Sequence, residues 1–213
     1  MPNILHKKFS YSFNYATLVI AALNVVAFIL TGSGRNLNAQ YLFGLQPILF
    51  LRGHYYWQLF TYMFMHGSWS HLVSNMIGLL FFGVYVEKQV GSKEFWLFYV
   101  LCGILCGAAS LAIYAVGGYW QIVLVGASGA VYAVLLLFAV IFPRSTVFIL
   151  GLVPVPAPLL IALYAGVAVF DQVFGMNKGV AHLTHLSGFA AAWLFCLVRY
   201  GVNPIKVWKN ALR

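Results

Sequence analysis

Charged residues, and acidic residues above all, are scarce in this sequence of 213 residues. Only 7% of the residues are charged, three are Asp or Glu, and 63% are hydrophobic. The mean hydropathy is +0.91. This composition excludes an ordinary soluble globular domain, in which about 25% of residues are charged. The sequence therefore predicts an integral membrane protein in a lipid bilayer.

Cysteine is also rare, and its placement excludes two common roles. Cys102, Cys106 and Cys196 all lie inside apolar segments, where a thiol behaves as a small hydrophobic group. The Cys102 and Cys106 pair has no polar ligands nearby, so the pattern indicates neither a zinc site nor a disulfide. We expect no metal and no cofactor.

Basic residues outnumber acidic ones and give a net charge of +9. A nucleic-acid partner would require them to form one face. They are instead scattered at the ends of apolar runs, which is typical of anchoring at a membrane surface. We therefore expect no nucleic-acid partner.

Apolar runs divide the chain into six candidate spans, and we expect an all-α bundle of six transmembrane helices in one domain over residues 1–213. A cleaved signal peptide is the alternative for the first run, but Thr31 and the glycines after it form a poor cleavage site. The segment 32–70 is semi-apolar and is expected to lie in the membrane interface. The expected spans are 15–31, 69–86, 95–116, 127–142, 156–174 and 180–198.

Six spans place both termini on the same side of the membrane. Nine Lys and Arg residues then fall on the terminal side, against Arg35, Arg52 and Lys178 on the other. The positive-inside rule predicts cytoplasmic termini. The fourth span is only about 24 Å long, against roughly 30 Å of hydrocarbon, so its outer end should be recessed. The fifth follows Pro154 and Pro156 and should be loosely held.

Four polar residues from three spans are predicted to lie at one depth. Spans two, four and six run in the same direction, so heights can be counted from their charged cytoplasmic ends at about 1.5 Å per residue. Ser128 and His71 then lie about 24 Å above these ends, His185 about 21 Å and Asn75 about 18 Å. The four side chains should therefore meet in one layer below the outer surface.

This layer contains the groups needed for nucleophilic catalysis. A serine becomes a nucleophile when a base such as histidine takes its proton, and Ser128 and His185 supply both. The three acids Glu87, Glu94 and Asp171 lie at loop or interface heights, so Ser128 and His185 would act as a dyad. His71 and Asn75, with backbone N–H groups at the start of the fourth span, can stabilise a developing oxyanion.

Three motifs together resemble those of the rhomboid intramembrane serine proteases. They are Gly126-Ala127-Ser128-Gly129, the His-x4-His-x3-Asn pattern from His66 to Asn75, and 181–188, which reads AHLTHLSG. The resemblance covers nearly the whole chain. It implies a six-helix enzyme that cleaves transmembrane segments of other proteins, with Ser128 as nucleophile and His185 as general base.

The same resemblance assigns the remaining site residues. His71 and Asn75 form the oxyanion site, and Tyr132 packs against the ring of His185. Gly126, Ala127 and Gly129 support the nucleophile. For His66, its position before span two favours a structural hydrogen bond to the loop over a catalytic role. Span six also contains His182, but His185 matches the His-x-x-Gly of the family and lies nearer the depth of Ser128.

Two positions depart from the family pattern. Rhomboids commonly have Trp-Arg in the first external loop, where this chain has Trp57-Gln58. They also have glycine on the sixth helix where this chain has Ala192. Neither change removes a catalytic group.

The resemblance also implies that substrate would enter between spans two and five. The minimal length of the chain suggests a bacterial inner membrane.

Three rival functions remain open. An inactive rhomboid-like protein would bind transmembrane helices without cleaving them, although Ser128 and His185 are both retained. A haem cytochrome would use intramembrane histidines as axial ligands but would leave Ser128 and Asn75 unexplained. A channel would need polar residues along a full path, and the inner halves of these spans are apolar.

Overall fold

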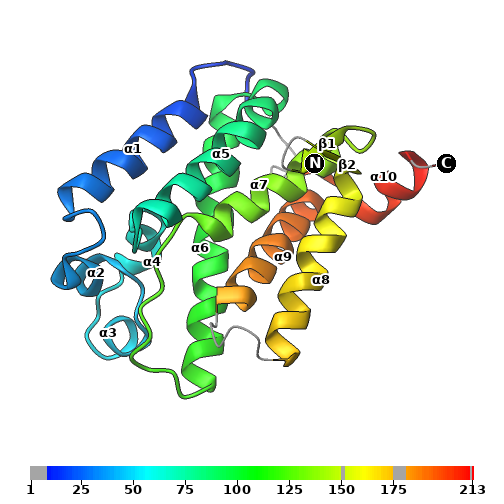
Figure 1. Cartoon of the computed structure of the whole chain (residues 1–213). Coiled ribbons are helices and arrows are strands. Elements are labelled where there is room, and N and C mark those ends of the chain that lie inside the picture. Colours follow the sequence, from blue (N-terminus) through cyan, green and yellow to red (C-terminus); the bar gives the residue numbers. More distant parts are fainter. Residues whose placement is uncertain (1–8, 150–151, 175–180, 212) are drawn as a thin grey trace, which may run out of the picture.

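The computed structural model describes residues 9–149, 152–174, 181–211 and 213, and most of them are helical (Figure 1). The order of elements is α1 (Ala16–Leu30), α2 (Leu37–Phe43), α3 (Pro47–Leu51), α4 (Gln58–Thr61), the 3-10 turn η2 (Tyr62–Phe64), α5 (Trp69–Val90), α6 (Ser92–Val116), α7 (Ser128–Ile141), β1 (Thr146–Ile149), β2 (Val153–Pro156), α8 (Ala157–Phe174), α9 (Ala181–Tyr200) and α10 (Pro204–Ala211).

Local sequence explains where the long helices begin and end. The Ser68 side chain accepts a hydrogen bond from the backbone N–H of His71 and caps α5, as serine commonly does. Gly91 has φ +84° and separates α5 from α6, a conformation that only glycine adopts readily. Pro156 ends β2 and Pro158 lies in the first turn of α8, where a missing N–H has no cost.

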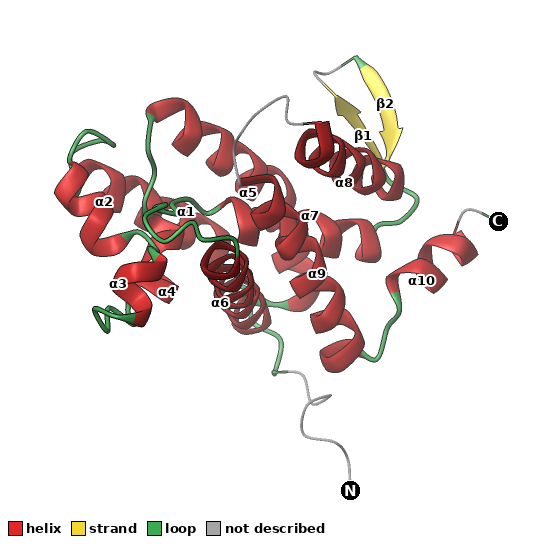
Figure 2. Ribbon diagram, turned by 90° about the horizontal axis from the view of Figure 1, so that it is seen from below, coloured by secondary structure: helices red, strands yellow, loops and turns green. Residues whose placement is uncertain are grey.

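Helix α7 lies at the centre of the bundle. It packs against α5, α6, α8 and α9, while α1 packs on the far side of α5 (Figure 1). The view from below shows the same central placement (Figure 2). Ten of its fourteen residues are buried, which fits a helix that is apolar on all sides. Because α7 begins at Ser128, this packing fixes the position of the predicted nucleophile.

Glu87 ties the start of α1 to the end of α5. Its carboxylate accepts hydrogen bonds from the backbone N–H groups of Ala16 (2.6 Å) and Thr17 (2.9 Å), and from the Thr17 hydroxyl (2.7 Å). Ser92, at the start of α6, also donates to it. A carboxylate at a helix N-terminus satisfies free N–H groups and the helix dipole. Glu87 therefore has a structural role. Helix α5 continues past Glu87 to Val90, whereas the sequence predicted an end near Val86.

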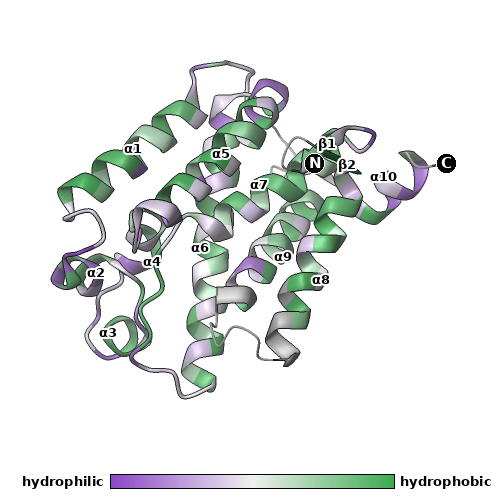
Figure 3. Cartoon of the chain, in the orientation of Figure 1, coloured by the Kyte–Doolittle hydropathy of each residue, from purple (hydrophilic) through white to green (hydrophobic). Residues whose placement is uncertain are grey.

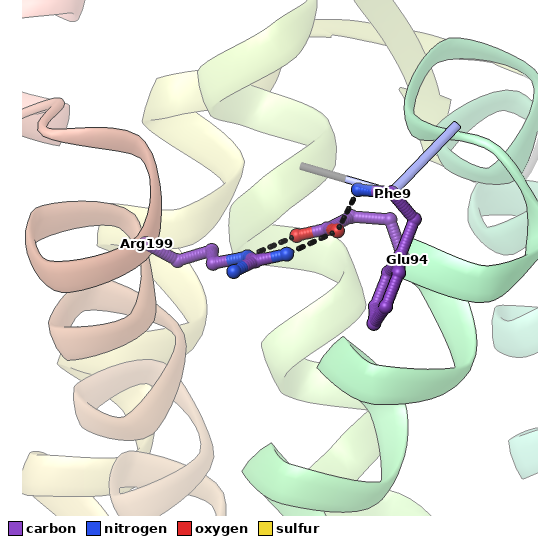
Figure 4. A network of polar contacts seen from close by, with 3 residues as sticks. All are labelled: Phe9, Glu94 and Arg199. Carbon is purple, nitrogen blue, oxygen red and sulfur yellow. Dashed lines mark hydrogen bonds and ion pairs between the residues drawn. The ribbon is translucent and has the colours of Figure 1, made fainter. Parts of the chain in front are cut away.

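A second acid joins the end of α9 to the start of α6. Arg199 donates from Nε to Oε1 of Glu94 (2.7 Å) and from a terminal nitrogen to Oε2 (2.9 Å), and the Phe9 backbone N–H lies 3.5 Å from Oε2 (Figure 4). Trp208 on α10 donates to the Ala139 carbonyl of α7 (2.9 Å). The C-terminal ends of α5, α7 and α9 therefore lie at the same end of the bundle, and the three helices run in the same direction.

The segment before α5 folds into short helices held by a buried amide. Gln58 is fully buried. Its Oε1 accepts from the Gln46 backbone N–H (3.1 Å), and its Nε2 donates to the Tyr41 carbonyl (2.8 Å). A neutral amide can satisfy both groups, whereas a buried arginine would need a counter-charge. This contact accounts for glutamine at the position where rhomboids commonly have arginine.

The helical membrane architecture agrees with the sequence prediction, with bounds within a few residues of those expected. Among the described residues, α5 and α6 are long and apolar enough to cross a membrane, and α9 with α10 would be a third crossing bent by 88°. Residues 16–30, 128–141 and 157–167 form shorter apolar helices, and Figure 3 shows apolar colour along α1, α7 and α8. Six crossings therefore remain a prediction.

A β-hairpin was not expected in an all-α fold. Strands β1 and β2 pair antiparallel between α7 and α8, with Thr146 opposite Pro156 and Ile149 opposite Val153. The Ser145 carbonyl accepts from the Ala157 N–H at 2.9 Å, which closes the base of the hairpin at the start of α8. Pro154 and Pro156, which were expected only to mark the start of the fifth helix, lie in β2.

Candidate active site

Ser128 and His185 lie in contact across the interface between α7 and α9. Their Oγ and Nε2 atoms are 3.2 Å apart, and both side chains are partly buried. Nε2 can accept the serine proton when Nδ1 carries the ring hydrogen. Two residues separated by 57 positions in the chain are thus placed as a nucleophile and a general base would be.

The ring of Tyr132 packs against the ring of His185. It lies one turn after Ser128 on α7, and its ring stacks on the His185 ring with centroids 4.2 Å apart and planes at 6°. Tyr164 on α8 and Phe189 on α9 pack against Tyr132 at 5.7 Å and 5.2 Å. The stack fixes the plane of the imidazole.

His71 and Asn75 face the same site from α5. Both line a cavity of about 400 Å³ together with Ser128 and His185. The Asn75 Nδ2 atom is buried and has no hydrogen-bond partner among the described residues. A buried donor without a partner is costly. This donor lines the same cavity as Ser128, so it could bind an acceptor atom of a bound molecule.

Gly126 makes room for the His71 ring. Its φ is +121°, and a Cβ placed there would lie 2.7 Å from both Cε1 and Nε2 of His71. Its N–H donates to the Tyr62 carbonyl (2.9 Å), while Leu45 and Leu124 exchange two backbone hydrogen bonds just before it. The segment leading into Ala127 and α7 is therefore held in an extended form.

Gly129 allows a second close approach. A Cβ there would overlap the sulfur of Cys106 on α6. The backbone N–H groups in the first turn of α7 have no partner within the helix. They are available at the end of the helix that carries a partial positive charge.

His66 lies behind His71 and is completely buried. The two rings meet edge to face with centroids 5.1 Å apart, and neither His66 nitrogen makes a geometrically sound hydrogen bond among the described residues. Burial and, secondarily, the neighbouring His71 lower the pKa of His66 to about 4. The structural hydrogen bond to the loop that was expected for His66 remains a prediction.

The remaining cavity wall is mostly apolar. It comes from α5, α7, α8, α9 and the segment before α7. It includes Gly78, Phe82, Leu124, Val125, Val131, Leu135, Tyr164 and Thr184. Ser74 adds a hydroxyl at the α5 side. No group of three or more metal-binding side chains occurs in the part of the chain that the structure describes. His182 belongs to the first turn of α9, and its side chain lies outside the described residues.

Sequence reasoning missed a set of buried polar groups directly behind His185. The Thr184 hydroxyl lies 3.0 Å from the Ser110 hydroxyl and 3.2 Å from that of Tyr114. The available signal was the presence of three hydroxyl side chains in otherwise apolar helices. Sequence alone does not show that they meet.

Comparison with known proteins gives one consistent family. A family profile described as Rhomboid domain matches residues 53–201. RHOMBOID-like protein 12, mitochondrial, from Arabidopsis thaliana is 35% identical over 148 residues, which cover 63% of this chain and 44% of that protein. RHOMBOID-like protein 4 from the same plant is 29% identical over 177 residues, covering 82% and 42%.

A bacterial relative also matches. Rhomboid protease GluP from Bacillus subtilis is 30% identical over 122 residues, which cover 56% of this chain and 23% of that protein. The chain spans less than half the length of these three relatives. Because mitochondrial and chloroplastic proteins are among the relatives, the comparisons do not support the expected bacterial inner membrane.

Proposed function

Because the chain belongs to the rhomboid family, we propose that it is an intramembrane serine protease that cleaves other proteins in or near their transmembrane segments. The observation that carries the proposal is the 3.2 Å contact between Ser128 Oγ and His185 Nε2. The contact lies inside a cavity of about 400 Å³ that also presents His71 and Asn75. Nucleophile, base and oxyanion donors thus share one space.

In the first half of the reaction, Ser128 Oγ attacks the carbonyl carbon of the scissile peptide bond, and its proton passes to His185 Nε2. His71, Asn75 and the N–H groups at the start of α7 stabilise the resulting oxyanion. The C–N bond then breaks as His185 returns the proton to the leaving nitrogen. The product is an ester between Ser128 and the N-terminal part of the substrate.

In the second half, His185 removes a proton from a water molecule that attacks this ester. The proton returns to Ser128, and the carboxylic acid product leaves. The described part of the chain places no carboxylate at His185, since Glu87 and Glu94 are bound elsewhere. Asp171 lies in the last turn of α8, and its side chain is outside the described residues. Stacking on Tyr132 orients the ring of the proposed base.

The membrane arrangement completes the proposal. Helices α1, α5, α6, α7, α8 and α9 form six crossings in one domain, with both termini on the more basic, cytoplasmic face. Substrate enters between α5 and α8, because α8 packs mainly on α7, α9 and the hairpin. The Ser128 end of α7 is recessed from the opposite face.

The test is labelling of the purified protein with a fluorophosphonate, followed by peptide mapping of the adduct and cleavage of a transmembrane reporter. We expect one adduct, on Ser128, and cleavage that persists with a chelator and disappears in Ser128→Ala and His185→Ala. Full cleavage by Ser128→Ala would overturn the proposal. Binding of the reporter without labelling or cleavage would identify the alternative, an inactive rhomboid-like protein.

A further inference from the structure

A chain of hydroxyl groups links α9 to α6 directly behind the catalytic histidine. Thr184, Ser110 and Tyr114 are all buried, and the Ser110 hydroxyl donates to the Cys106 carbonyl at 2.9 Å. One order of donors satisfies these contacts: Tyr114 donates to Thr184, Thr184 to Ser110, and Ser110 to the backbone. Such a chain stabilises its members cooperatively in a medium of low dielectric constant.

A second contact joins the same two helices. The Cys106 thiol donates to the backbone carbonyl of Thr184, with sulfur and oxygen 3.1 Å apart. Cys106, Ser110 and Tyr114 are spaced by four residues, so they share one face of α6. Thr184 is thus bound to α6 through both its side chain and its backbone.

Thr184 and His185 are neighbours that face different helices. Adjacent residues are separated by about 100° around a helix axis, so Thr184 contacts α6 while His185 contacts Ser128 on α7. Fixing Thr184 against α6 therefore sets both the rotation and the height of the turn that carries His185.

We propose that Thr184 is a positioning residue for the catalytic dyad, through hydrogen bonds to α6 that hold His185 Nε2 against Ser128 Oγ. This inference rests on the proposed function. Here Tyr132 sets the plane of the ring, and Thr184 sets the helix that carries it.

The experiment compares Thr184→Val, which keeps the shape and removes the hydroxyl, with Thr184→Ser, which keeps the hydroxyl. The readouts are the rate of fluorophosphonate labelling of Ser128, and kcat and KM on a transmembrane reporter, below the unfolding temperature of each variant. A misplacement of about 1 Å can cost about 100-fold, so we expect Thr184→Val to lower the labelling rate and kcat about ten- to 100-fold, with KM nearly unchanged. Thr184→Ser should retain the labelling rate and the kcat of the wild type.

Ser187→Ala is the matched control. The Ser187 hydroxyl donates to the Leu183 carbonyl (2.8 Å), so it lies on the same helix and, among the described residues, bonds within that helix. This variant should label like the wild type. Ser110→Ala removes the α6 partner of Thr184 and should slow labelling in the same direction, which keeps the test available if Thr184→Val does not fold.

The outcomes separate this inference from the proposed function. The positioning role would be overturned if Thr184→Val and Ser110→Ala were labelled at the normal rate. It would also be overturned if Thr184→Ser were labelled as slowly as Thr184→Val. Either result would leave the protease assignment intact. A loss confined to KM would also overturn the positioning role, because it would indicate substrate binding at the cavity wall. A folded wild-type protein that is never labelled would overturn the proposed function, and this inference with it.

Discussion

Gly188 on α9 faces the backbone carbonyl oxygen of Gly129 on α7 so closely that a Cβ at Gly188 would overlap it. Gly129 follows Ser128 in the chain, and Gly188 lies one turn after His185. A close approach of the two backbones therefore lies next to Ser128 and His185. Small residues at such crossings allow helices to pack by direct backbone contact. One turn later, Ala192 is fully buried at the α9 interface, so that position accommodates a Cβ.

Gly188→Ala should push α9 away from α7 and separate Ser128 from His185. Since a displacement of about 1 Å can cost about 100-fold in rate, we expect a loss of that order in reporter cleavage and in labelling of Ser128. Gly166→Ala on α8 is the control, because a Cβ there meets nothing within 4 Å. Equal activity of the two variants would contradict the role of this contact.

Gly126→Ala should damage the oxyanion site and leave the dyad in place. The new Cβ would lie 2.7 Å from the His71 ring and would require an unfavourable φ of +121°. Loss of one oxyanion donor typically costs about 100- to 1,000-fold in turnover. We expect kcat to fall by about 100-fold.

The control for Gly126→Ala separates backbone strain from the clash. Gly118 also has a positive φ, +77°, but a Cβ there has open space around it. Gly118→Ala should therefore have a modest effect on stability and almost none on kcat. Similar losses of kcat in both variants would show that strain, and not displacement of His71, is responsible.

The sequence allowed a prediction that the site residues share one depth, because helix rise is fixed and charged residues mark the membrane boundary. That reasoning brought Ser128, His185, His71 and Asn75 to one layer, and all four line one cavity. Counting residues gives the height of a side chain along its helix but not its direction around the helix axis. Which side chains meet within the layer depends on packing between helices that are apolar on several faces.

Thr184 shows this limit directly. Serine and threonine in apolar helices often bond to a carbonyl four residues earlier, as Ser187 does with Leu183. Sequence alone cannot distinguish this local role from the contact between Thr184 and Ser110 across two helices. The β1–β2 hairpin was missed for a related reason, since the uniform apolar composition of 147–153 hides any alternation between two faces.

The Glu94–Arg199 pair should stabilise the end of the bundle remote from the dyad. Glu94 is 1% exposed and Arg199 13%, so Glu94→Gln leaves a charged guanidinium with a weaker acceptor. Hydrogen bonds to charged groups contribute about 1.5–3 kcal/mol, and we expect a loss of about 2 kcal/mol in the free energy of unfolding in detergent. The labelling rate of the folded protein should not change.

Lys93→Gln is the control for this pair, because Lys93 is exposed on the same turn of α6. It alters the net charge by one unit without touching Arg199. If Glu94→Gln and Lys93→Gln unfold at the same denaturant concentration, the ion pair contributes nothing to stability.

His66 should make the protein less stable in acid. Its pKa is lowered to about 4 by burial and by His71, whereas a histidine in the unfolded chain has a pKa of about 6.5. Below pH 6.5 the unfolded state therefore takes up a proton that the folded state does not. The stability due to neutral His66 is fully present above pH 6.5 and is lost as the pH falls toward 4. Between pH 7 and 5 the loss amounts to about 2 kcal/mol.

Unfolding measured in detergent at pH 7 and at pH 5 tests this expectation. His66→Phe removes the titrating ring while filling the same space, so it should flatten the pH dependence relative to the wild type. An unchanged slope in His66→Phe would show that His66 is not the group that takes up the proton on unfolding, and would direct the search to His71, whose ring lies against it.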